Sequence, residues 1–264
     1  ATGLPTRTEQ GDLNLALFAG HGEFPRIIYA PGTVTDAYTC TQMAFIMADK
    51  YQVPVIVLTD QYFLDSFATV EKLDTRFHTN EYFIVETEPG YKRYAKTDNG
   101  VSPRGIPGYG TGLVCVDSDE HDEDGRIKED YDTRVSMVDK RLKKSIFLQN
   151  DALLPELSGS PKYDILLVSW GSSYHAVKEA VERIGRDDIG FLHFKQVYPL
   201  PENVPNYFER ATTKIIIENN ATAQFGMLIE REFGITIDEC ILKYNGLPFT
   251  PEEIIDNINE LLGT

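Results

Sequence analysis

The chain has 264 residues, a length that suits one large α/β domain or two smaller ones. Hydrophobic residues make up 42% of it and charged residues 25%, a balance typical of a globular protein rather than a disordered one. It carries 25 Lys and Arg against 41 Asp and Glu, a formal net charge of −16. Because such a chain repels phosphate backbones, we expect no nucleic acid partner.

Membrane contact is also not expected. No apolar run reaches the ~18 residues of a membrane-spanning helix, and no charged-then-apolar leader opens the sequence. The three cysteines, Cys40, Cys115 and Cys240, form no C-x-x-C pair, so this chain alone is expected to build neither a zinc knuckle nor an iron–sulfur cluster. Their sparse, odd number fits a reducing cytoplasm. Because the sequence opens with Ala1 instead of Met, we expect a processed, truncated or partial polypeptide.

Regular structure is predicted to begin at Arg26, since the residues before it are rich in Gly, Thr and Pro. Arg26–Ala30 is predicted as a short strand, and Thr33–Tyr51 places apolar residues at helical spacing. Val53–Asp60 is a continuous apolar run, typical of a parallel strand covered on both faces. Together they predict a strand–helix–strand unit with a right-handed crossover.

The middle of the chain, about 69–160, is less regular. In order, it contains a predicted strand, a Gly- and Pro-rich stretch, an acidic run and a basic segment, at Tyr82–Glu86, Val101–Gly112, 117–132 and Thr133–Leu148. A loop region this long in a folded protein is usually functional or part of an interface.

The last hundred residues alternate between strands and helices. The predicted strands are Tyr163–Ser169, Ile189–Phe194, Thr213–Glu218 and Cys240–Tyr244, with helices after Ser173 and at 221–233 and 251–262. The last helix opens with Thr250 as N-cap, Pro251 at its first position and Glu253 completing a capping box. This alternation predicts a second parallel α/β domain.

Common nucleotide and hydrolase motifs are missing. No G-x-G-x-x-G follows a strand, and neither G-x-x-x-x-G-K-[ST] nor G-x-S-x-G occurs. Trp170–Ser173 (W-G-S-S) follows a strand, where backbone N–H groups could hold an anion. A tight turn with a serine N-cap is the favoured interpretation.

The acidic run Asp117–Asp124 gathers carboxylates around His121. A calcium loop is disfavoured, because its twelfth position would be Tyr131 instead of a glutamate. Two interpretations stay open: an acidic turn paired with the basic segment, which composition favours, and a lid whose His121 and Asp122 meet a substrate. His21, in a Gly-flanked turn, could also reach a ligand, whereas His175 and His193 are expected to be structural.

Residues 2–12 are dense in hydroxyls around Gly and Pro and include Arg7. Hydroxyl and amide groups on a rigid loop can fix a carboxylate. Alone, this signal is weak, because many surface turns have the same composition.

These segments together resemble the α subunits of the 2-oxoacid:ferredoxin oxidoreductases, most of all the 2-oxoglutarate (2-oxoglutarate synthase) type. The matching motifs follow the family's order over nearly the whole chain: T-G-L-P-T-R-T-E-Q-G-D-L at 2–13, G-H-G-E-F-P-R at 20–26, K-Y-Q-V-P-V-I-V-L-T-D-Q-Y at 50–62, V-S-P-R-G-I-P-G at 101–108, D-S-D-E-H-D-E-D-G at 117–125, D-K-R-L-K-K at 139–144, V-Y-P-L-P at 197–201 and E-N-N-A-T-A-Q at 218–224.

The resemblance implies an α/β, transketolase-like fold that binds thiamine diphosphate. Residues 1–150 would be the later part of an incomplete pyrimidine-binding domain with a long acidic excursion, and residues 160–264 a parallel α/β domain like the transketolase C-terminal domain. It also implies a hetero-oligomer of anaerobic metabolism, in which a β subunit binds the diphosphate with Mg²⁺ and carries an iron–sulfur cluster. The implied reaction is the oxidative decarboxylation of a 2-oxoacid with coenzyme A, giving an acyl-CoA, CO₂ and reduced ferredoxin; further small subunits are left open.

The family's catalytic motifs, Y-P-I-T-P-S-S, a glutamate and an arginine, would lie upstream of Ala1, so the resemblance assigns no catalytic residue to this chain. It implies that Thr6 holds the substrate and that Arg7 supports its loop. The family's substrate-side aspartate would be Asp122, or Asp119 in another register, with His121 shaping the pocket. The resemblance therefore favours the lid interpretation of the acidic run.

Arg104 is a candidate for a second cationic contact to a dicarboxylate substrate. Two rivals of the enzyme hypothesis are a non-catalytic docking module for a β subunit and a component of a 2-oxoacid dehydrogenase, which would need a lipoyl-domain partner.

Overall fold

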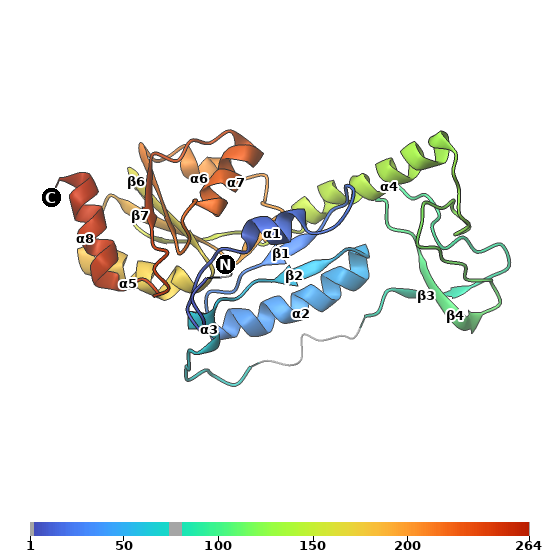
Figure 1. The fold of residues 1–264 in the computed structure, drawn as a ribbon, viewed down its shortest axis with the longest axis horizontal. Helices are drawn as coiled ribbons and strands as arrows, with labels where there is room; N and C mark the ends of the chain where they lie inside the picture. Colours follow the sequence, from blue (N-terminus) through green and yellow to red (C-terminus); the bar gives the residue numbers. More distant parts are fainter. Residues whose placement is uncertain (1–2, 74–80, 264) are drawn as a thin grey trace.

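The computed structural model describes residues 3–73 and 81–263, which form a body and a projecting lobe (Figure 1). Ala1 and Thr2, the start of the N-terminal motif, lie outside the described residues. The first half contains α1 (Leu13–Phe18), β1 (Ile27–Tyr29), α2 (Val34–Tyr51), β2 (Val55–Val57), α3 (Gln61–Leu64), β3 (Ile84–Thr87), β4 (Arg104–Gly110) and α4 (Tyr131–Asn150). The second half contains β5 (Glu156–Gly159), β6 (Ile165–Trp170), the 3₁₀ turn η1 (Gly171–Ser173), α5 (Tyr174–Ile184), β7 (Ile189–Phe194), β8 (Gln196–Tyr198), α6 (Pro205–Phe208), β9 (Thr213–Glu218), α7 (Gln224–Phe233), β10 (Glu239–Leu242) and α8 (Pro251–Leu262).

The predicted strand–helix–strand unit is confirmed, because β1 and β2 pair in parallel on either side of α2. Helix α2 begins at Thr33, whose hydroxyl accepts a hydrogen bond from the backbone N–H of Asp36. Strand β2 packs on both faces, as expected, because Ile56 contacts one core cluster and Val55 and Val57 contact another. It lies at the edge of a sheet ordered β2-β1-β8, and its three residues are of intermediate burial.

Strand β8, which the sequence patterns did not predict, joins the two halves of the chain. It returns from the second half to pair antiparallel with β1, aligning Tyr198 with Ile28 and Gln196 with Tyr29. Helix α1 also packs into the same core as β6 and α7. The two parts that the sequence divides near residue 150 thus share a sheet and a core, while the division itself stays a prediction.

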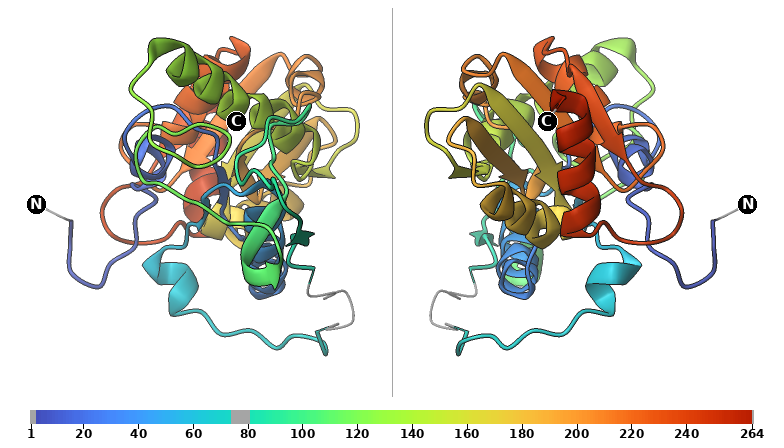
Figure 2. Two further views of the ribbon diagram at one scale, coloured as in Figure 1. Left: turned by 90° about the vertical axis from the view of Figure 1, so that its right-hand side faces the viewer. Right: turned by 90° about the vertical axis from the view of Figure 1, so that its left-hand side faces the viewer.

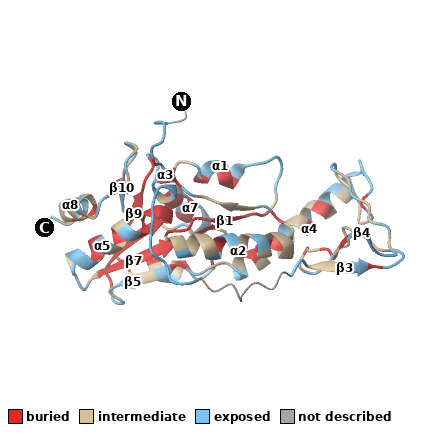
Figure 3. Cartoon of the chain, turned by 90° about the horizontal axis from the view of Figure 1, so that it is seen from below, coloured by how far each residue is buried: buried red, intermediate tan, exposed pale blue. Residues whose placement is uncertain are grey.

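The larger sheet has the strand order β10-β9-β6-β7-β5. Its pairs are parallel except for the edge strand β5, which runs antiparallel to β7. Successive side chains of a strand point to opposite faces, so Leu166 and Val168 of β6 enter one core and Leu167 the other. Helices α5 and α8 cover the second face, and α8 lies in front of the strands in the right-hand view of Figure 2. Figure 3 shows these central strands as the most continuously buried part of the chain.

The lobe carries β3 and β4, which pair in parallel, and α4 links it to the body (Figure 1). The basic segment, for which the sequence predicted no secondary structure, forms most of α4. Asp130 caps this helix by accepting a hydrogen bond from the Thr133 backbone N–H at 2.8 Å. Within the described residues, no helix combines the length and apolar character needed to cross a bilayer.

Candidate functional site

The N-terminal segment, residues 3–12, lies along the loops that follow β9 and β10. The backbone N–H of Thr8 donates to the Gly246 carbonyl at 3.2 Å, and that of Gln10 to the Asn219 carbonyl at 2.7 Å. These contacts are at the carboxyl edge of the larger sheet, the edge at which open α/β sheets commonly bind ligands. The hydroxyl-rich segment singled out in the sequence is thus held at that edge.

Gln10 anchors this segment. Its side-chain amide donates to the Trp170 carbonyl at 2.8 Å, and its Oε1 accepts from the Asn219 backbone N–H at 2.9 Å. Gln10 is only 4% exposed, so these hydrogen bonds form away from competing water. One side chain therefore bridges the ends of β6 and β9 and fixes the chain four residues after Thr6.

A buried carboxylate supports this anchor from beneath. Glu218 is fully buried and accepts hydrogen bonds from the Trp170 indole, the Asn220 amide and the backbone N–H groups of Phe225 and Gly226. Burial raises the pKa of Glu218, whereas these four donors act in the opposite direction. The Asn220 amide also reaches the Gln10 carbonyl at 3.2 Å, which connects the carboxylate to the N-terminal segment.

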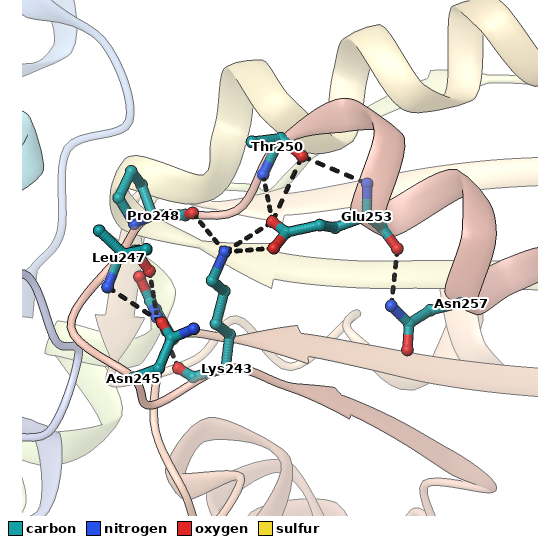
Figure 4. Close-up of polar contacts among 8 residues, drawn as sticks. Lys243, Asn245, Leu247, Pro248, Thr250, Glu253 and Asn257 are labelled. Carbon is teal, nitrogen blue, oxygen red and sulfur yellow. Dashed lines mark hydrogen bonds and ion pairs between the residues drawn. The ribbon is translucent and has the colours of Figure 1, made fainter.

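The loop after β10 is fixed by α8. Lys243 Nζ donates to both Glu253 carboxylate oxygens at 2.6 Å and to the Pro248 carbonyl at 2.9 Å (Figure 4). Thr250 and Glu253 form the predicted capping box at the start of α8. The Lys243 ammonium lowers the pKa of Glu253. Because Gly246 in this loop bonds Thr8, the loop also supports the N-terminal segment.

Thr6 and Arg7 lie at the surface of this edge. Both are exposed, and the backbone of Arg7 passes so close to Gly246 that a Cβ added there would lie 3.0 Å from the Arg7 Cβ. Thr6 has a φ of +54°. That left-handed conformation is strained for a β-branched residue and is found mostly where the surrounding structure enforces it, often at ligand sites.

Beside Gln10 is a narrow crevice of about 20 Å³, room for about one water molecule. Its walls include the carboxylates of Glu9, Asp12 and Asp60 and no Lys or Arg. This acidic lining does not fit a diphosphate, because the carboxylates would repel its negative charge. Among the described residues, no three His, Cys, Asp or Glu side chains converge on a point that could hold a metal ion.

The W-G-S-S segment makes the predicted tight turn, with Gly171 at a φ of +61°. Ser173 occupies the predicted N-cap position of α5, but its hydroxyl donates to the Trp170 carbonyl and makes no capping hydrogen bond to the helix. Ser172 donates to Asp60, which itself caps α3. Both hydroxyls serve the turn and the crevice wall, which leaves the helix N-terminus without a side-chain cap.

The acidic run docks onto the basic segment through Glu120. Its carboxylate accepts from Arg134 at 2.7 Å and from two guanidinium nitrogens of Arg141 at 3.0 and 2.8 Å. The two guanidinium groups, Arg141 foremost, lower the pKa of Glu120 to about 2. The interpretation of an acidic turn paired with the basic segment is therefore confirmed in geometry, and the lid role stays a prediction.

His121 and Asp122 are held within this turn. His121 packs on the Tyr94 ring at 3.8 Å and its Nδ1 lies 2.8 Å from the Asp119 carbonyl. Asp122 accepts from the backbone N–H groups of Asp124 and Arg126, and the Arg126 bond chiefly lowers the pKa of Asp122. The Asp122 carboxylate thus shapes its own turn.

Beside this turn, a pocket of about 250 Å³ opens at the N-terminal half of α4. Its lining comes from three segments and consists of His21, Gly22, Glu23, Phe24, Ser118, Asp119, Glu120, His121, Arg134 and Arg141. The pocket contains His121 and Asp119 but not Asp122, and it adds His21, whose role the sequence had left open.

Arg104 is in the lobe, at the start of β4. It donates to Asp49 at 2.9 Å and to the Tyr82 carbonyl at 2.6 Å, and its Nε is buried without a hydrogen-bond partner. Asp49, the partner of Arg104, is near the C-terminal end of α2. The N-terminal segment instead contacts α3, where the Tyr62 backbone N–H donates to the Thr8 hydroxyl. The role of Arg104 as a substrate contact stays a prediction.

The five sequence-predicted residues therefore fall in three places: Thr6 and Arg7 at the sheet edge, His121 and Asp122 in the acidic turn, and Arg104 at the start of β4. Sequence reasoning missed Gln10, Glu218 and Asn219, although E-N-N and T-E-Q stood within the quoted motifs. Their signal was a cluster of polar residues directly after an apolar strand. Only the fold shows that these two motifs meet.

Residues 1–140 match the family model described as pyruvate flavodoxin/ferredoxin oxidoreductase, thiamine diphosphate-binding. The chain is 36% identical over 264 aligned residues to the "2-oxoacid:ferredoxin oxidoreductase 1, subunit alpha" of Sulfurisphaera tokodaii, covering 96% of this chain and 41% of that one. It is 27% identical to the "2-oxoglutarate synthase subunit KorA" of Archaeoglobus fulgidus, covering 97% of this chain and 67% of that relative.

Among solved structures, the 2-oxoglutarate:ferredoxin oxidoreductase of Magnetococcus marinus, with 2-oxoglutarate, coenzyme A and succinyl-CoA bound, superposes with a TM-score of 0.82 and 29% identity. The match covers 98% of this chain and 46% of that one. The chain thus spans about two-fifths of the length of the Sulfurisphaera relative and somewhat less than half of the Magnetococcus chain.

Proposed function

Because this chain belongs to the thiamine-diphosphate-binding family of pyruvate flavodoxin/ferredoxin oxidoreductases, we propose that it is the α subunit, or the C-terminal part of the α subunit, of a 2-oxoacid:ferredoxin oxidoreductase. The reaction would be the oxidative decarboxylation of a 2-oxoacid with coenzyme A to an acyl-CoA, CO₂ and reduced ferredoxin. We propose 2-oxoglutarate as the substrate and the cytoplasm as the location.

The observation that carries this proposal is the 36% identity to a 2-oxoacid:ferredoxin oxidoreductase α subunit along almost all of this chain. The choice of 2-oxoglutarate draws support from the Magnetococcus protein, whose structure holds that 2-oxoacid and succinyl-CoA. Relatives at 36% identity carry the broader description "2-oxoacid", so the substrate is the finer part of the proposal.

We propose that a β subunit holds most of the thiamine diphosphate, its Mg²⁺ and the iron–sulfur cluster. The acidic crevice beside Gln10 does not suit a diphosphate, so the residues around it are not assigned to that cofactor. The chain would instead complete a site whose diphosphate-binding half belongs to the β subunit, within a hetero-oligomer that passes electrons to ferredoxin.

Within this chain, Thr6 is the proposed substrate contact. Its hydroxyl can donate to a carboxylate, and its strained backbone is held by the Thr8 and Gln10 anchors. Arg7, in contact with the loop at Gly246, would support the same segment. Asp122, with His121, would shape the pocket from the acidic turn, which requires another chain or another copy to bring the turn to Thr6.

We also propose that residues 1–150 are the later part of the pyrimidine-binding domain and residues 160–264 the transketolase C-terminal-like domain. The strand–helix–strand unit and the mostly parallel five-stranded sheet support this division. The shared strand β8 implies that the two would not separate as independent units.

Purification of the native complex under anaerobic conditions, through a tag on this chain, tests the proposal. We expect a co-purifying chain with an iron–sulfur absorption spectrum and bound thiamine diphosphate. A lipoyl-domain partner without iron would favour the dehydrogenase alternative. A β subunit that binds but leaves the complex inactive with every 2-oxoacid would favour the docking module.

A further inference from the structure

Helix α4 buries charged as well as apolar residues on its inner face. Its buried face consists of Met137, Lys140, Lys144 and Leu148, so two of the four buried residues are lysines. Burial, chiefly, lowers the pKa of each lysine to about 8. A surface helix of a monomer normally buries its apolar stripe and exposes its charges. The longer apolar stripe of α4 lies on its outer side.

That outer stripe consists of Tyr131, Val135, Val138, Leu142 and Ile146, spaced four, three, four and four residues apart. At about 100° per residue, this spacing aligns all five along one side, opposite the buried face. Tyr131, Val135, Leu142 and Ile146 are 89%, 60%, 38% and 60% exposed, and Val138 at the centre is half-buried.

The stripe is symmetric about its centre. If a second α4 runs antiparallel, with the two-fold axis beside Val138, Tyr131 faces Ile146 of the second copy and Val135 faces its Leu142. A two-fold interface requires this reciprocity, because every contact between residues i and j occurs twice. Spacings of three and four residues are also those of knobs-into-holes helix packing.

The charges beside the stripe obey the same symmetry. Asp132 and Lys143 lie along one flank of the stripe, and each would approach the other residue in the second copy. Among the described residues, neither side chain has an ion-pair partner within the chain. In a parallel arrangement, Asp132 of one copy and Lys143 of the other would lie roughly 16 Å apart along the helices and could not pair.

We propose that the outer face of α4 is a self-association surface that packs antiparallel against α4 of a second copy of this chain. The apolar stripe supplies the contact, and the two Asp132–Lys143 pairs fix its direction. A single helix pair buries less than the ~800 Å² per partner of a standard interface, so this contact works as part of a larger assembly.

Site-directed cross-linking in the native complex tests the register directly. The background is Cys115→Ser with Cys240→Ser; Cys40 is buried and stays. Val138→Cys should cross-link two copies of this chain through a short bis-maleimide. Tyr131→Cys alone should not, because the two positions would be about 22 Å apart along the helices. A mixture of Tyr131→Cys and Ile146→Cys chains should cross-link again.

Measuring the mass of the complex in solution, which reports how many copies of this chain associate, provides the second test. Leu142→Asp should raise the dissociation constant between copies by about tenfold or more. Leu261→Asp on α8 is the matched control, because Leu261 is 41% exposed and Leu142 is 38% exposed. Asp132→Lys and Lys143→Asp should each weaken association. The double variant should restore it, because the two charges are exchanged and can pair again. None of these changes is on the buried face of α4.

Failure of Val138→Cys to join two copies, or its capture of a different subunit, would overturn the proposal. Self-linkage of Tyr131→Cys would contradict the antiparallel register. Unchanged association in Leu142→Asp, together with a failure of the double charge variant to restore the single ones, would also overturn it.

Discussion

Gln10 and Asn219 hold one another through two hydrogen bonds although 209 residues separate them in the chain. The Gln10 backbone N–H donates to the Asn219 carbonyl, and the Asn219 backbone N–H donates to Gln10 Oε1. Through this pairing, the second half of the chain positions the N-terminal segment on which the proposed substrate contact Thr6 lies.

Gln10→Ala should therefore lower the free energy of unfolding by about 1–3 kcal/mol, because it leaves the Asn219 N–H buried without a partner and removes one of the two hydrogen bonds to the Trp170 carbonyl. Urea denaturation measures this effect. Glu9→Ala, on the exposed neighbouring residue, is the matched control. Equal stability of the two variants would show that the anchor contributes nothing.

Thr6→Ala should raise the KM for the 2-oxoacid in the native complex by roughly tenfold, the loss of a hydrogen bond to a charged group. Thr6→Ser keeps the hydroxyl and should retain most of the affinity. Steady-state kinetics with saturating coenzyme A separates the two variants. If Thr6→Ser is as impaired as Thr6→Ala, the hydroxyl is not the substrate contact.

Arg104 is tested by comparing two substrates. Arg104→Ala should raise the KM for 2-oxoglutarate more than the KM for pyruvate, because its guanidinium is the predicted contact to the second carboxylate. Loss of its ion pair with Asp49 and of its bond to the Tyr82 carbonyl should also destabilise the lobe. Asp49→Asn should cause a similar loss of stability. An equal change of the KM for both substrates would remove Arg104 from the substrate pocket.

Glu120→Gln should loosen the acidic turn from α4, since it removes the charge that two arginines share. The arginines lower the pKa of Glu120 to about 2, so its contribution to stability is complete above pH ~4.5 and is lost as the pH falls toward 2. Hydrogen exchange of residues 117–130 at neutral pH should accelerate in Glu120→Gln but not in the control Asp124→Asn. Unchanged protection would show that the ion pairs do not hold the turn.

The buried ring of His193 should make stability depend on pH in a second range. Burial, with the charges of Lys195 and His175, lowers its pKa to about 3, so the folded state keeps the ring neutral. Stability is full above pH ~6.5 and falls below it, because only the unfolded chain gains the proton. Below that pH, the free energy of unfolding should fall by about 1.4 kcal/mol per pH unit.

Between pH 6.5 and 5 this amounts to a loss of about 2 kcal/mol, measured by urea denaturation at several pH values. His193→Gln should flatten that slope, whereas His175→Gln, on the exposed face of α5, should not. Parallel curves for wild type and His193→Gln would exclude His193 as the cause.

Much of the fold could be predicted from local patterns. The strands β7 and β9 and the helix α8 have the predicted bounds, since apolar runs and a capping box are local signals. Strand β8 was missed because its three residues pair only with the distant β1. Helix α4 was missed because its charges dominate the composition of the basic segment.

The site was harder to predict than the fold. Motifs marked Thr6 and the acidic turn, but the partners that hold them, Gln10 with Asn219 and Glu120 with Arg141, are distant in sequence. Polar pairs of this kind leave no periodic pattern. The order of the motifs along the sequence also gives no sign that Thr6 and Asp122 lie in different parts of this chain.

The most direct test of the proposed function is viologen reduction by the native complex, purified anaerobically through this chain and supplied with thiamine diphosphate. We expect reduction with 2-oxoglutarate that requires coenzyme A and exceeds the reduction with pyruvate or branched 2-oxoacids. No reduction with any 2-oxoacid, in a complex shown to contain the β subunit and its cofactors, would contradict the proposed function.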